Sequence, residues 1–223
     1  MSTRTTPVEG SRVPISRELQ DTRLIAILRG RDSSCAEAVV DTLVSNGIRC
    51  LELTMTTPGA LEVIERLAGR LPAEIDLGMG TVLSAADVGR AADAGARFVV
   101  SPSVSVEVIE TAHRRGIASY PGAFTPTEIH AAWIAGASAV KLFPGGSLGP
   151  GYLSAVRGPL PDIPIVPTGS ISLADIDTWF AAGAQAVGLG SPLIGDAMTR
   201  GGDLNALAER TRIACAAAME GRR

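Results

Sequence analysis

Residues 135–144, Ala135-Gly136-Ala137-Ser138-Ala139-Val140-Lys141-Leu142-Phe143-Pro144, show the local pattern from which the fold is predicted. A helical stretch ends at Gly136, because a glycine just past a helix suits the left-handed C′ position. An apolar run follows at once and predicts a short buried strand over residues 138–143. The same order of helix end, glycine and strand recurs at Asn46-Gly47-Ile48, Ala94-Gly95-Ala96, Arg115-Gly116-Ile117 and Ala182-Gly183-Ala184.

The spacing of these signals predicts the fold class. Neighbouring glycines lie 20 or 21 residues apart, or about twice that where one signal is missing. A repeat of roughly 20–25 residues predicts eight βα units, and so an α/β protein with a single (β/α)8 TIM barrel. An open doubly wound sheet is the alternative; even spacing and the lack of a GxGxxG motif after the first strand argue against it. The eight strands are expected at about 24–28, 49–54, 75–79, 97–101, 117–120, 138–143, 163–167 and 186–189.

Sequence signals also predict where the domain and some helices begin. The Thr-, Ser-, Arg- and Pro-rich start predicts a flexible tail over residues 1–17, with the barrel domain over residues 18–223. Thr125-Pro126-Thr127-Glu128 and Ser34…Glu37 have the hydroxyl and acid of a capping box. The Gly- and Pro-rich connection after Phe143 predicts only a short helix.

Composition excludes several classes of function. With 46% hydrophobic and 19% charged residues and a net charge of −3, the chain has no feature expected of a nucleic-acid or membrane-surface partner. No apolar run of about 18 residues predicts a membrane span, and no signal peptide is expected. Cys35, Cys50 and Cys215 are widely spaced, which predicts reduced thiols and a cytoplasmic protein. With only His113 and His130, a three-histidine zinc site is impossible, and no metal site is expected.

Lys141 is the only lysine; the other nineteen of the 20 basic side chains are arginines. Lys141 lies in an apolar run, where desolvation favours the neutral amine, a form that arginine does not adopt. A neutral amine in an apolar pocket is suited to Schiff-base formation with a carbonyl. The alternative is a lysine whose stem is buried and whose amine reaches solvent.

Strand alternation places Glu52 on the same inner face as Lys141. Along residues 50–55, Cys50, Glu52 and Thr54 alternate with the apolar Leu51, Leu53 and Met55. The apolar face is expected to meet the helices, so Glu52 is expected to point to the barrel axis. There it would meet Lys141 and Phe143, which share one face of their strand. A structural ion pair is the other explanation for a buried Glu52.

Further polar groups are expected at the carboxyl ends of the strands, where barrel enzymes place their sites. Arg29 directly follows the first strand, although an arginine there is often only a surface residue. Pro167-Thr168-Gly169-Ser170 follows the seventh strand, and Gly188-Leu189-Gly190-Ser191 the eighth. Small residues let backbone N–H groups approach an anion, so these loops predict a phosphate site.

Six motifs occur in the following order along the chain: Leu51-Glu52-Leu53-Thr54, Gly78-Met79-Gly80-Thr81-Val82-Leu83, Val100-Ser101-Pro102, Pro121-Gly122-Ala123-Phe124-Thr125-Pro126-Thr127-Glu128, Lys141-Leu142-Phe143-Pro144 and Pro167-Thr168-Gly169-Ser170. With these motifs the sequence resembles the class I aldolases that act on 2-keto-3-deoxy-6-phosphogluconate, its galactonate epimer and 4-hydroxy-2-oxoglutarate. The resemblance extends from about Arg23 to about Ala208.

The resemblance implies a role for each matching residue. Lys141 would form the Schiff base, and Glu52 would be the general acid/base. Thr81 would hold the substrate carboxylate, Pro102 and Phe143 would wall the pyruvyl pocket, and Gly169, Ser170, Gly190 and Ser191 would bind phosphate. Thr56 stands where some members carry a carboxylate-binding arginine, so Arg29 is expected to supply that charge. Ser170 replaces the second glycine of the usual phosphate loop but keeps a backbone N–H.

The resemblance also implies a metal-independent lyase that needs no cofactor, has a small keto-acid phosphate as its partner and assembles as a homotrimer. Both C4 epimers and the unphosphorylated 4-hydroxy-2-oxoglutarate fit the motifs. Three other functions fit part of the sequence: a sugar-phosphate epimerase or synthase without an imine, a magnesium-dependent keto-acid aldolase, and a catalytically silent binding subunit.

Overall fold

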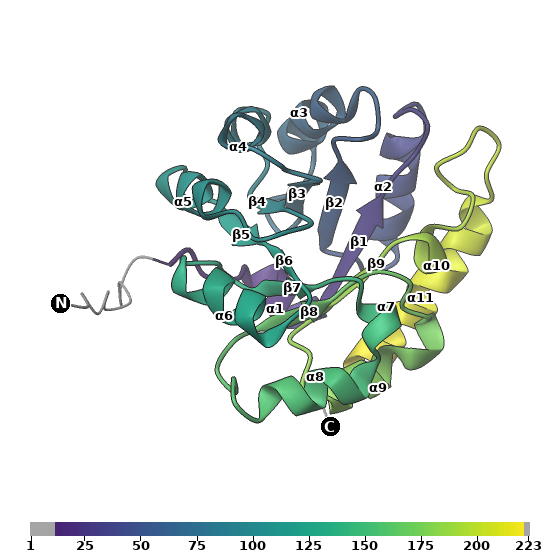
Figure 1. Cartoon of the computed structure of the whole chain (residues 1–223). Coiled ribbons are helices and arrows are strands. Elements are labelled where there is room, and N and C mark those ends of the chain that lie inside the picture. Colours follow the sequence, from purple (N-terminus) through teal and green to yellow (C-terminus); the bar gives the residue numbers. More distant parts are fainter. Residues whose placement is uncertain (1–11, 221–223) are drawn as a thin grey trace.

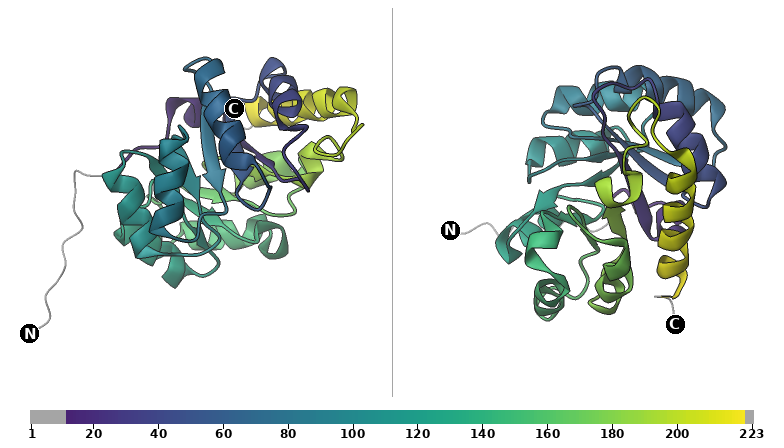
Figure 2. Two further views of the ribbon diagram at one scale, coloured as in Figure 1. Left: turned by 90° about the horizontal axis from the view of Figure 1, so that it is seen from above. Right: turned by 90° about the vertical axis from the view of Figure 1, so that its right-hand side faces the viewer.

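The structure is a computed structural model that describes residues 12–220. Strands and helices alternate along this part of the chain, and the helices surround the strands (Figures 1 and 2). The strands are β1 (Leu24–Leu28), β2 (Cys50–Thr54), β3 (Asp76–Gly80), β4 (Phe98–Val100), β5 (Ala118–Tyr120), β6 (Gly122–Ala123), β7 (Val140–Leu142), β8 (Ile165–Pro167) and β9 (Val187–Leu189).

These strands form two parallel sheets. The larger has the order β5-β4-β3-β2-β1-β9, and the smaller has the order β6-β7-β8. Only Pro121 separates β5 from β6, and the Ser138 N–H donates to the Ser119 carbonyl at 3.0 Å. At the other junction, Thr168 and Gly188 form a parallel bridge between the ends of β8 and β9. The α/β class with parallel strands is thereby confirmed.

The helices cover the outer faces of the strands, and α11 contacts α2, α9 and α10. No helix within residues 12–220 is long and apolar enough to cross a membrane. The helices are α1 (Arg17–Thr22), α2 (Ala36–Ser45), α3 (Ala60–Arg70), α4 (Ala85–Asp93), α5 (Val106–Arg114), α6 (Pro126–Ile134), α7 (Gly145–Leu148), α8 (Pro150–Arg157), α9 (Ile176–Ala181), α10 (Ser191–Ile194) and α11 (Leu204–Glu220), with a 3₁₀ helix at Leu173–Asp175.

Glycine ends the helices as the sequence predicts. All five glycines of the repeated pattern have positive φ: Gly47, Gly95, Gly116, Gly136 and Gly183. This left-handed conformation lets the chain leave a helix and enter the next strand within one or two residues.

Two local predictions are wrong. Ser34 does not cap α2; Cys35 precedes the helix without a side-chain cap, and Glu37 instead accepts a hydrogen bond from Arg66 at 2.8 Å. The connection after Phe143 holds two helices, α7 and α8, since Pro150 starts a second helix within it. The capping box of Thr125 and Glu128 is confirmed, with both reciprocal bonds present.

The folded part of the chain begins before residue 18. Of the predicted tail, residues 1–11 lie outside the described residues. The Arg12 guanidinium lies 3.3 Å from the centroid of the Trp133 ring and donates to the Trp133 carbonyl at 2.7 Å. Ser16 caps α1 by accepting from the Leu19 N–H at 3.2 Å. Residues 12–17 therefore contact the fold.

Two hydrophobic clusters lie on the two faces of the strands, one toward the helices and one toward the interior between the strands. The larger lies between strands and helices and includes Leu51 and Leu53. The smaller joins Leu19 of α1 to inward side chains of the strands, including Cys50 and Ala139. Leu19 thus packs at the amino ends of the strands, and the carboxyl ends hold the cavity described next.

Candidate active site

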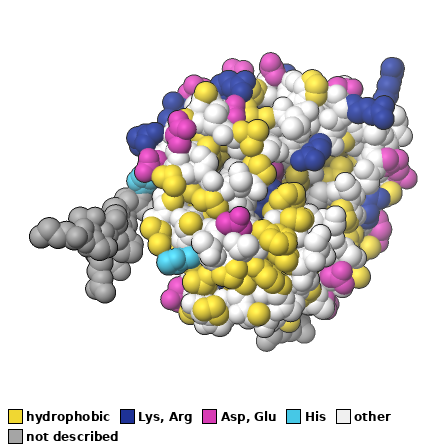
Figure 3. Space-filling model, in the orientation of Figure 1, with side chains coloured by type: hydrophobic (Ala, Val, Ile, Leu, Met, Phe, Trp, Pro, Cys, Tyr) yellow, Lys and Arg dark blue, Asp and Glu magenta, His cyan; other side chains and the backbone are white. Residues whose placement is uncertain are grey.

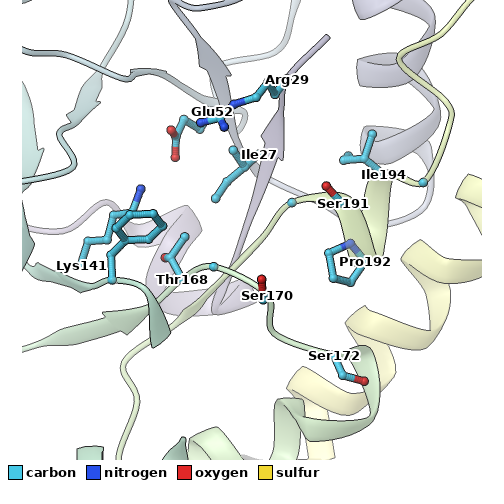
Figure 4. A pocket seen from close by; sticks show the side chains of 14 residues that line it. Ile27, Arg29, Glu52, Lys141, Thr168, Ser170, Ser172, Ser191, Pro192 and Ile194 are labelled. Atoms are coloured by element: carbon cyan, nitrogen blue, oxygen red, sulfur yellow. The ribbon is translucent and has the colours of Figure 1, made fainter. Parts of the chain in front are cut away.

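A cavity of about 660 Å³ opens at the carboxyl ends of the strands. On the face shown in Figure 3, basic atoms lie within a hollow and hydrophobic side chains gather below it. Strands β1, β2 and β7 and the loops after β8 and β9 contribute the walls (Figure 4). The lining residues are Ile27, Arg29, Glu52, Lys141, Phe143, Thr168, Gly169, Ser170, Ser172, Gly190, Ser191, Pro192, Ile194 and Gly195.

Lys141 and Glu52 face one another across this cavity from different sheets (Figure 4). Glu52 lies in β2, in register with Ile27 of β1 and Gly78 of β3, and only 3% of it is exposed. Lys141 is half-buried, and its Nζ lies 4.9 Å from the centroid of the Phe143 ring. The inward direction predicted for both side chains is confirmed.

Burial raises the pKa of the Glu52 carboxyl above its ordinary value, because the charged form loses its hydration. The positive charges of Lys141 and Arg29 act in the opposite direction and offset part of this effect. Glu52 is therefore a carboxyl group able to hold a proton at a higher pH than an exposed glutamate, as a general acid/base requires.

Gly80 of β3 makes the space that the Glu52 carboxylate occupies. A Cβ atom added at Gly80 would lie 2.0 Å from Glu52 Oε1 and 2.8 Å from its Cδ. A residue with a side chain at position 80 would displace the carboxylate.

Arg29 lines the cavity and points toward Glu52 (Figure 4). Its loop is fastened to the end of β2, since the Gly30 N–H donates to Thr57 Oγ1 at 3.0 Å. Thr57 is buried, and its hydroxyl lies 3.1 Å from Thr54 Oγ1. Sequence reasoning did not single out Thr57, although its place in the run of threonines after β2 could have suggested it. Thr56 is exposed and does not line the cavity.

The loops after β8 and β9 form the other end of the cavity, where the described lining carries no charged side chain. The Gly145 N–H donates to the Thr168 carbonyl at 2.7 Å, and the Gly146 N–H donates to the Gly169 carbonyl at 2.8 Å. The loop after β8 is thus held by backbone bonds. Gly190 precedes α10, which begins at Ser191.

Thr81 and Pro102 are not among the residues that line the cavity. Both follow strands of the larger sheet, β3 and β4, and both are partly buried. The structure instead adds apolar wall residues that sequence reasoning missed, among them Ile27 and Ile194. Ile27 is two residues before Arg29 on the inward face of β1, so strand alternation could have identified it.

Comparison with known proteins shows the family of the chain. The family model "KDPG and KHG aldolase" matches residues 15–209. The chain belongs to the KDPG and KHG aldolase family. It is 42% identical over 179 residues to the "Probable 2-dehydro-3-deoxy-6-phosphogalactonate aldolase" of Rhizobium meliloti (strain 1021), covering 80% of this chain and 84% of the relative.

A second relative and a solved structure also match most of the chain. The 2-dehydro-3-deoxy-phosphogluconate aldolase of Pseudoalteromonas atlantica is 32% identical over 196 residues, covering 87% of this chain and 91% of the relative. A solved structure described as "Native KDPGal structure" superposes with a TM-score of 0.83 at 31% identity, covering 89% of this chain and 95% of that one. Members of this aldolase family are lyases, and the chain is accordingly a lyase.

The raised pKa of Glu52 predicts how Glu52→Gln changes stability with pH. The folded state binds more protons than the unfolded state between the ordinary and the raised pKa of this carboxyl. Its contribution to stability is therefore full below the ordinary pKa and is lost as pH rises through the raised pKa. Relative to the wild type, Glu52→Gln should become more stable as pH rises from below the ordinary pKa of the carboxyl to above it, as measured by urea unfolding at one pH on each side.

Glu128→Gln is the matched control, because it is expected to give the opposite sign. Backbone N–H groups of Phe124 and Thr125 lower the pKa of the exposed Glu128 carboxyl. That contribution is present above the ordinary pKa and is lost as pH falls. If Glu52→Gln changed stability by the same amount at both pH values, the carboxyl would not be protonated preferentially in the folded state.

Proposed function

We propose that this protein is a class I aldolase that cleaves 2-keto-3-deoxy-6-phosphogluconate, or its galactonate epimer, to pyruvate and glyceraldehyde 3-phosphate. The observation that carries the proposal is the sole lysine of the chain, which reaches into the cavity opposite a buried glutamate with a raised pKa. Phosphogalactonate and phosphogluconate aldolases among the relatives support the substrate class.

The chemistry begins when Lys141 Nζ attacks the C2 carbonyl and water leaves, giving an imine. The protonated imine withdraws electrons from the C3–C4 bond. Removal of the C4 hydroxyl proton by a base then breaks that bond, releases the aldehyde and leaves the pyruvate enamine. Protonation at C3 and hydrolysis of the imine release pyruvate and regenerate Lys141.

Glu52 would move the protons in these steps, and the position of its carboxyl opposite Lys141 across the cavity supports this role (Figure 4). Arg29 would pair with the C1 carboxylate, since its guanidinium lies on the same side as Glu52. Phe143 would wall the pyruvyl portion together with Pro102. Thr81 would contact the carboxylate, as the family resemblance implies. The uncharged loops with Gly169, Ser170, Gly190 and Ser191 would receive the phosphate.

The second candidate substrate is 4-hydroxy-2-oxoglutarate, which would give pyruvate and glyoxylate through the same imine. It is favoured by the family model, which spans both KDPG and KHG aldolases. A sugar-phosphate enzyme without an imine would use the same two loops but would leave the placement of Lys141 opposite Glu52 without a role.

We also infer that the two sheets make one closed (β/α)8 barrel, with β5 and β6 together in one of eight strand positions. The Ser138–Ser119 bond and the Thr168–Gly188 bridge at the two junctions support closure. The barrel domain would take up residues 18–223, after an N-terminal segment in which Arg12 and Ser16 contact the barrel. A cytoplasmic location is supported by the three free thiols, since a reducing compartment preserves them.

Imine formation is tested by borohydride reduction in the presence of pyruvate. One three-carbon unit should be added, and peptide mapping should place it at Lys141, because no other lysine competes. Lys141→Arg keeps the charge and should abolish both trapping and turnover. Label at the N-terminal amine with an unmodified Lys141 would refute the mechanism. Glu52→Gln should still be trapped but turn over about 10²–10⁴-fold more slowly.

The phosphate end of the cavity is tested with Gly190→Asp. A Cβ atom at Gly190 meets nothing within 4 Å, so the carboxylate adds charge without a clash. It should repel the phosphate and lower kcat/KM for the phosphorylated substrate, relative to 4-hydroxy-2-oxoglutarate, by about tenfold or more. Gly151→Asp, in equally open space on α8, is the control and should leave this ratio unchanged. Equal losses on both substrates would favour the unphosphorylated acid.

We further propose a homotrimer, as the family resemblance implies. Large apolar side chains are exposed near the carboxyl ends of β3, β4 and β6: Leu83 is 64%, Val106 53% and Phe124 43% exposed. Such exposure suits a protein interface. Sedimentation should give three times the chain mass, and Leu83→Asp should lower it. A wild-type protein that sediments as one chain would contradict the proposal.

A further inference from the structure

We propose that the Ser170 hydroxyl binds the substrate phosphate and determines the preference for phosphorylated over unphosphorylated substrates. This inference rests on the proposed function and deepens it. Without the Ser170 hydroxyl, only the backbone N–H groups of the loop would provide the preference for phosphorylated substrates.

The backbone conformation at Ser170 is the first observation. Its φ is +54°, in the left-handed region that glycine occupies freely and other residues rarely adopt. Arg23 is the only other described residue besides glycine with positive φ. Arg23 follows α1, and its side chain contacts the Phe180 ring and the Ala184 carbonyl. Ser170 has no comparable contacts that would explain the strained conformation.

Close backbone packing surrounds the loop at Ser170. The Gly146 N–H donates to the Gly169 carbonyl, and a Cβ atom at Gly146 would lie 2.6 Å from the Ser170 carbonyl. Two backbone segments therefore lie against one another, and the loop has little room to relax. Glycine would satisfy this geometry at lower cost, so the presence of serine points to a use for its side chain.

The position of the hydroxyl is the second observation. The Ser170 side chain is exposed and directed into the space between the loops after β8 and β9, with the Ser191 hydroxyl on the other side (Figure 4). The Ser170 side chain makes no hydrogen bond with another described residue, so its O–H is available to a ligand in the cavity.

The charges of the cavity make this hydroxyl important. The only basic side chains among the lining residues are Lys141 and Arg29, and both lie at the end with Glu52. A phosphate in the outer loops must therefore be held by backbone N–H groups and hydroxyls. One additional hydrogen-bond donor would then contribute strongly to the affinity for phosphate, because hydrogen bonds to charged groups are stronger than those between neutral groups.

The experiment compares Ser170→Gly with Ser170→Ala, which separate the hydroxyl from the strain. Both remove the hydroxyl, but only glycine relieves the left-handed conformation. Both variants should lower the ratio of kcat/KM for the phosphorylated substrate to that for 2-keto-3-deoxygluconate by about tenfold. Ser170→Gly alone should also raise Tm by about 2–4 °C. Ser147→Ala on α7 removes a nearby hydroxyl that does not line the cavity, and should change neither quantity.

Distinct outcomes test the inference and the proposed function. If the wild type prefers the phosphorylated substrate and both variants keep that ratio, the inference fails while the proposed function stands. If the wild type shows no such preference and inorganic phosphate does not compete with substrate, the proposed substrate class fails, and this inference with it. A lowered ratio in Ser170→Gly but not in Ser170→Ala would assign the effect to loop conformation and also overturn the role of the hydroxyl.

Discussion

The candidate site depends on a carboxyl group and an amine, Glu52 and Lys141, that face each other inside a parallel-stranded interior. Desolvation makes a lone buried charge costly, so Glu52 requires the opposing charges of Lys141 and Arg29. Neither Glu52 nor Lys141 forms a salt bridge with another described residue, so the two groups interact through space. The gap between them is room for a small carbonyl compound. A direct ion pair would have occupied that room and made both groups less reactive.

Strand register makes this arrangement possible. Side chains alternate along β2, so a shift of one residue would send Glu52 into the layer of Leu51 and Leu53, against the helices. The neighbouring strand must also leave space, and Gly80 does so, since any side chain there would meet Glu52 Oε1. The position of the Glu52 carboxylate thus requires both the register of β2 and the absence of a side chain at Gly80 of β3. This explains why a glycine stands inside a buried strand, although glycine weakens the packing there.

The inward faces and the helix ends could be predicted from the sequence because each rests on a local rule. Period-two alternation placed Glu52 and Lys141, and positive φ at Gly136 follows from the chain reversal after a helix. The failures involve contacts between distant residues. Glu37 binds Arg66 on the next helix and so does not complete the cap of α2. Thr57 acquires its importance only because the loop after β1 folds over to meet it.

The same distinction applies to the candidate site. Motif similarity marked Thr81 and Pro102, whose roles stay predictions. They follow β3 and β4, whereas the residues that line the cavity come from β1, β2, the end of β7 and the loops after β8 and β9. In the phosphate loop, the sequence shows a serine in place of a glycine, but its left-handed φ becomes visible only in three dimensions.

The two ends of the cavity differ in chemical character. Charged groups lie at one end, on strands whose positions are fixed by the sheets, and the loops with serine and glycine lie at the other. Under the proposed function, binding energy gained at the loop end, remote from the C3–C4 bond, would hold the carbonyl against Lys141 and so support turnover as well as affinity. Because the loop after β8 is anchored by backbone bonds from Gly145 and Gly146, exchange of a loop side chain would then alter which substrate tail is accepted without moving Lys141 and Glu52. A single scaffold can thereby serve keto acids that share a pyruvyl portion and differ in everything beyond C4.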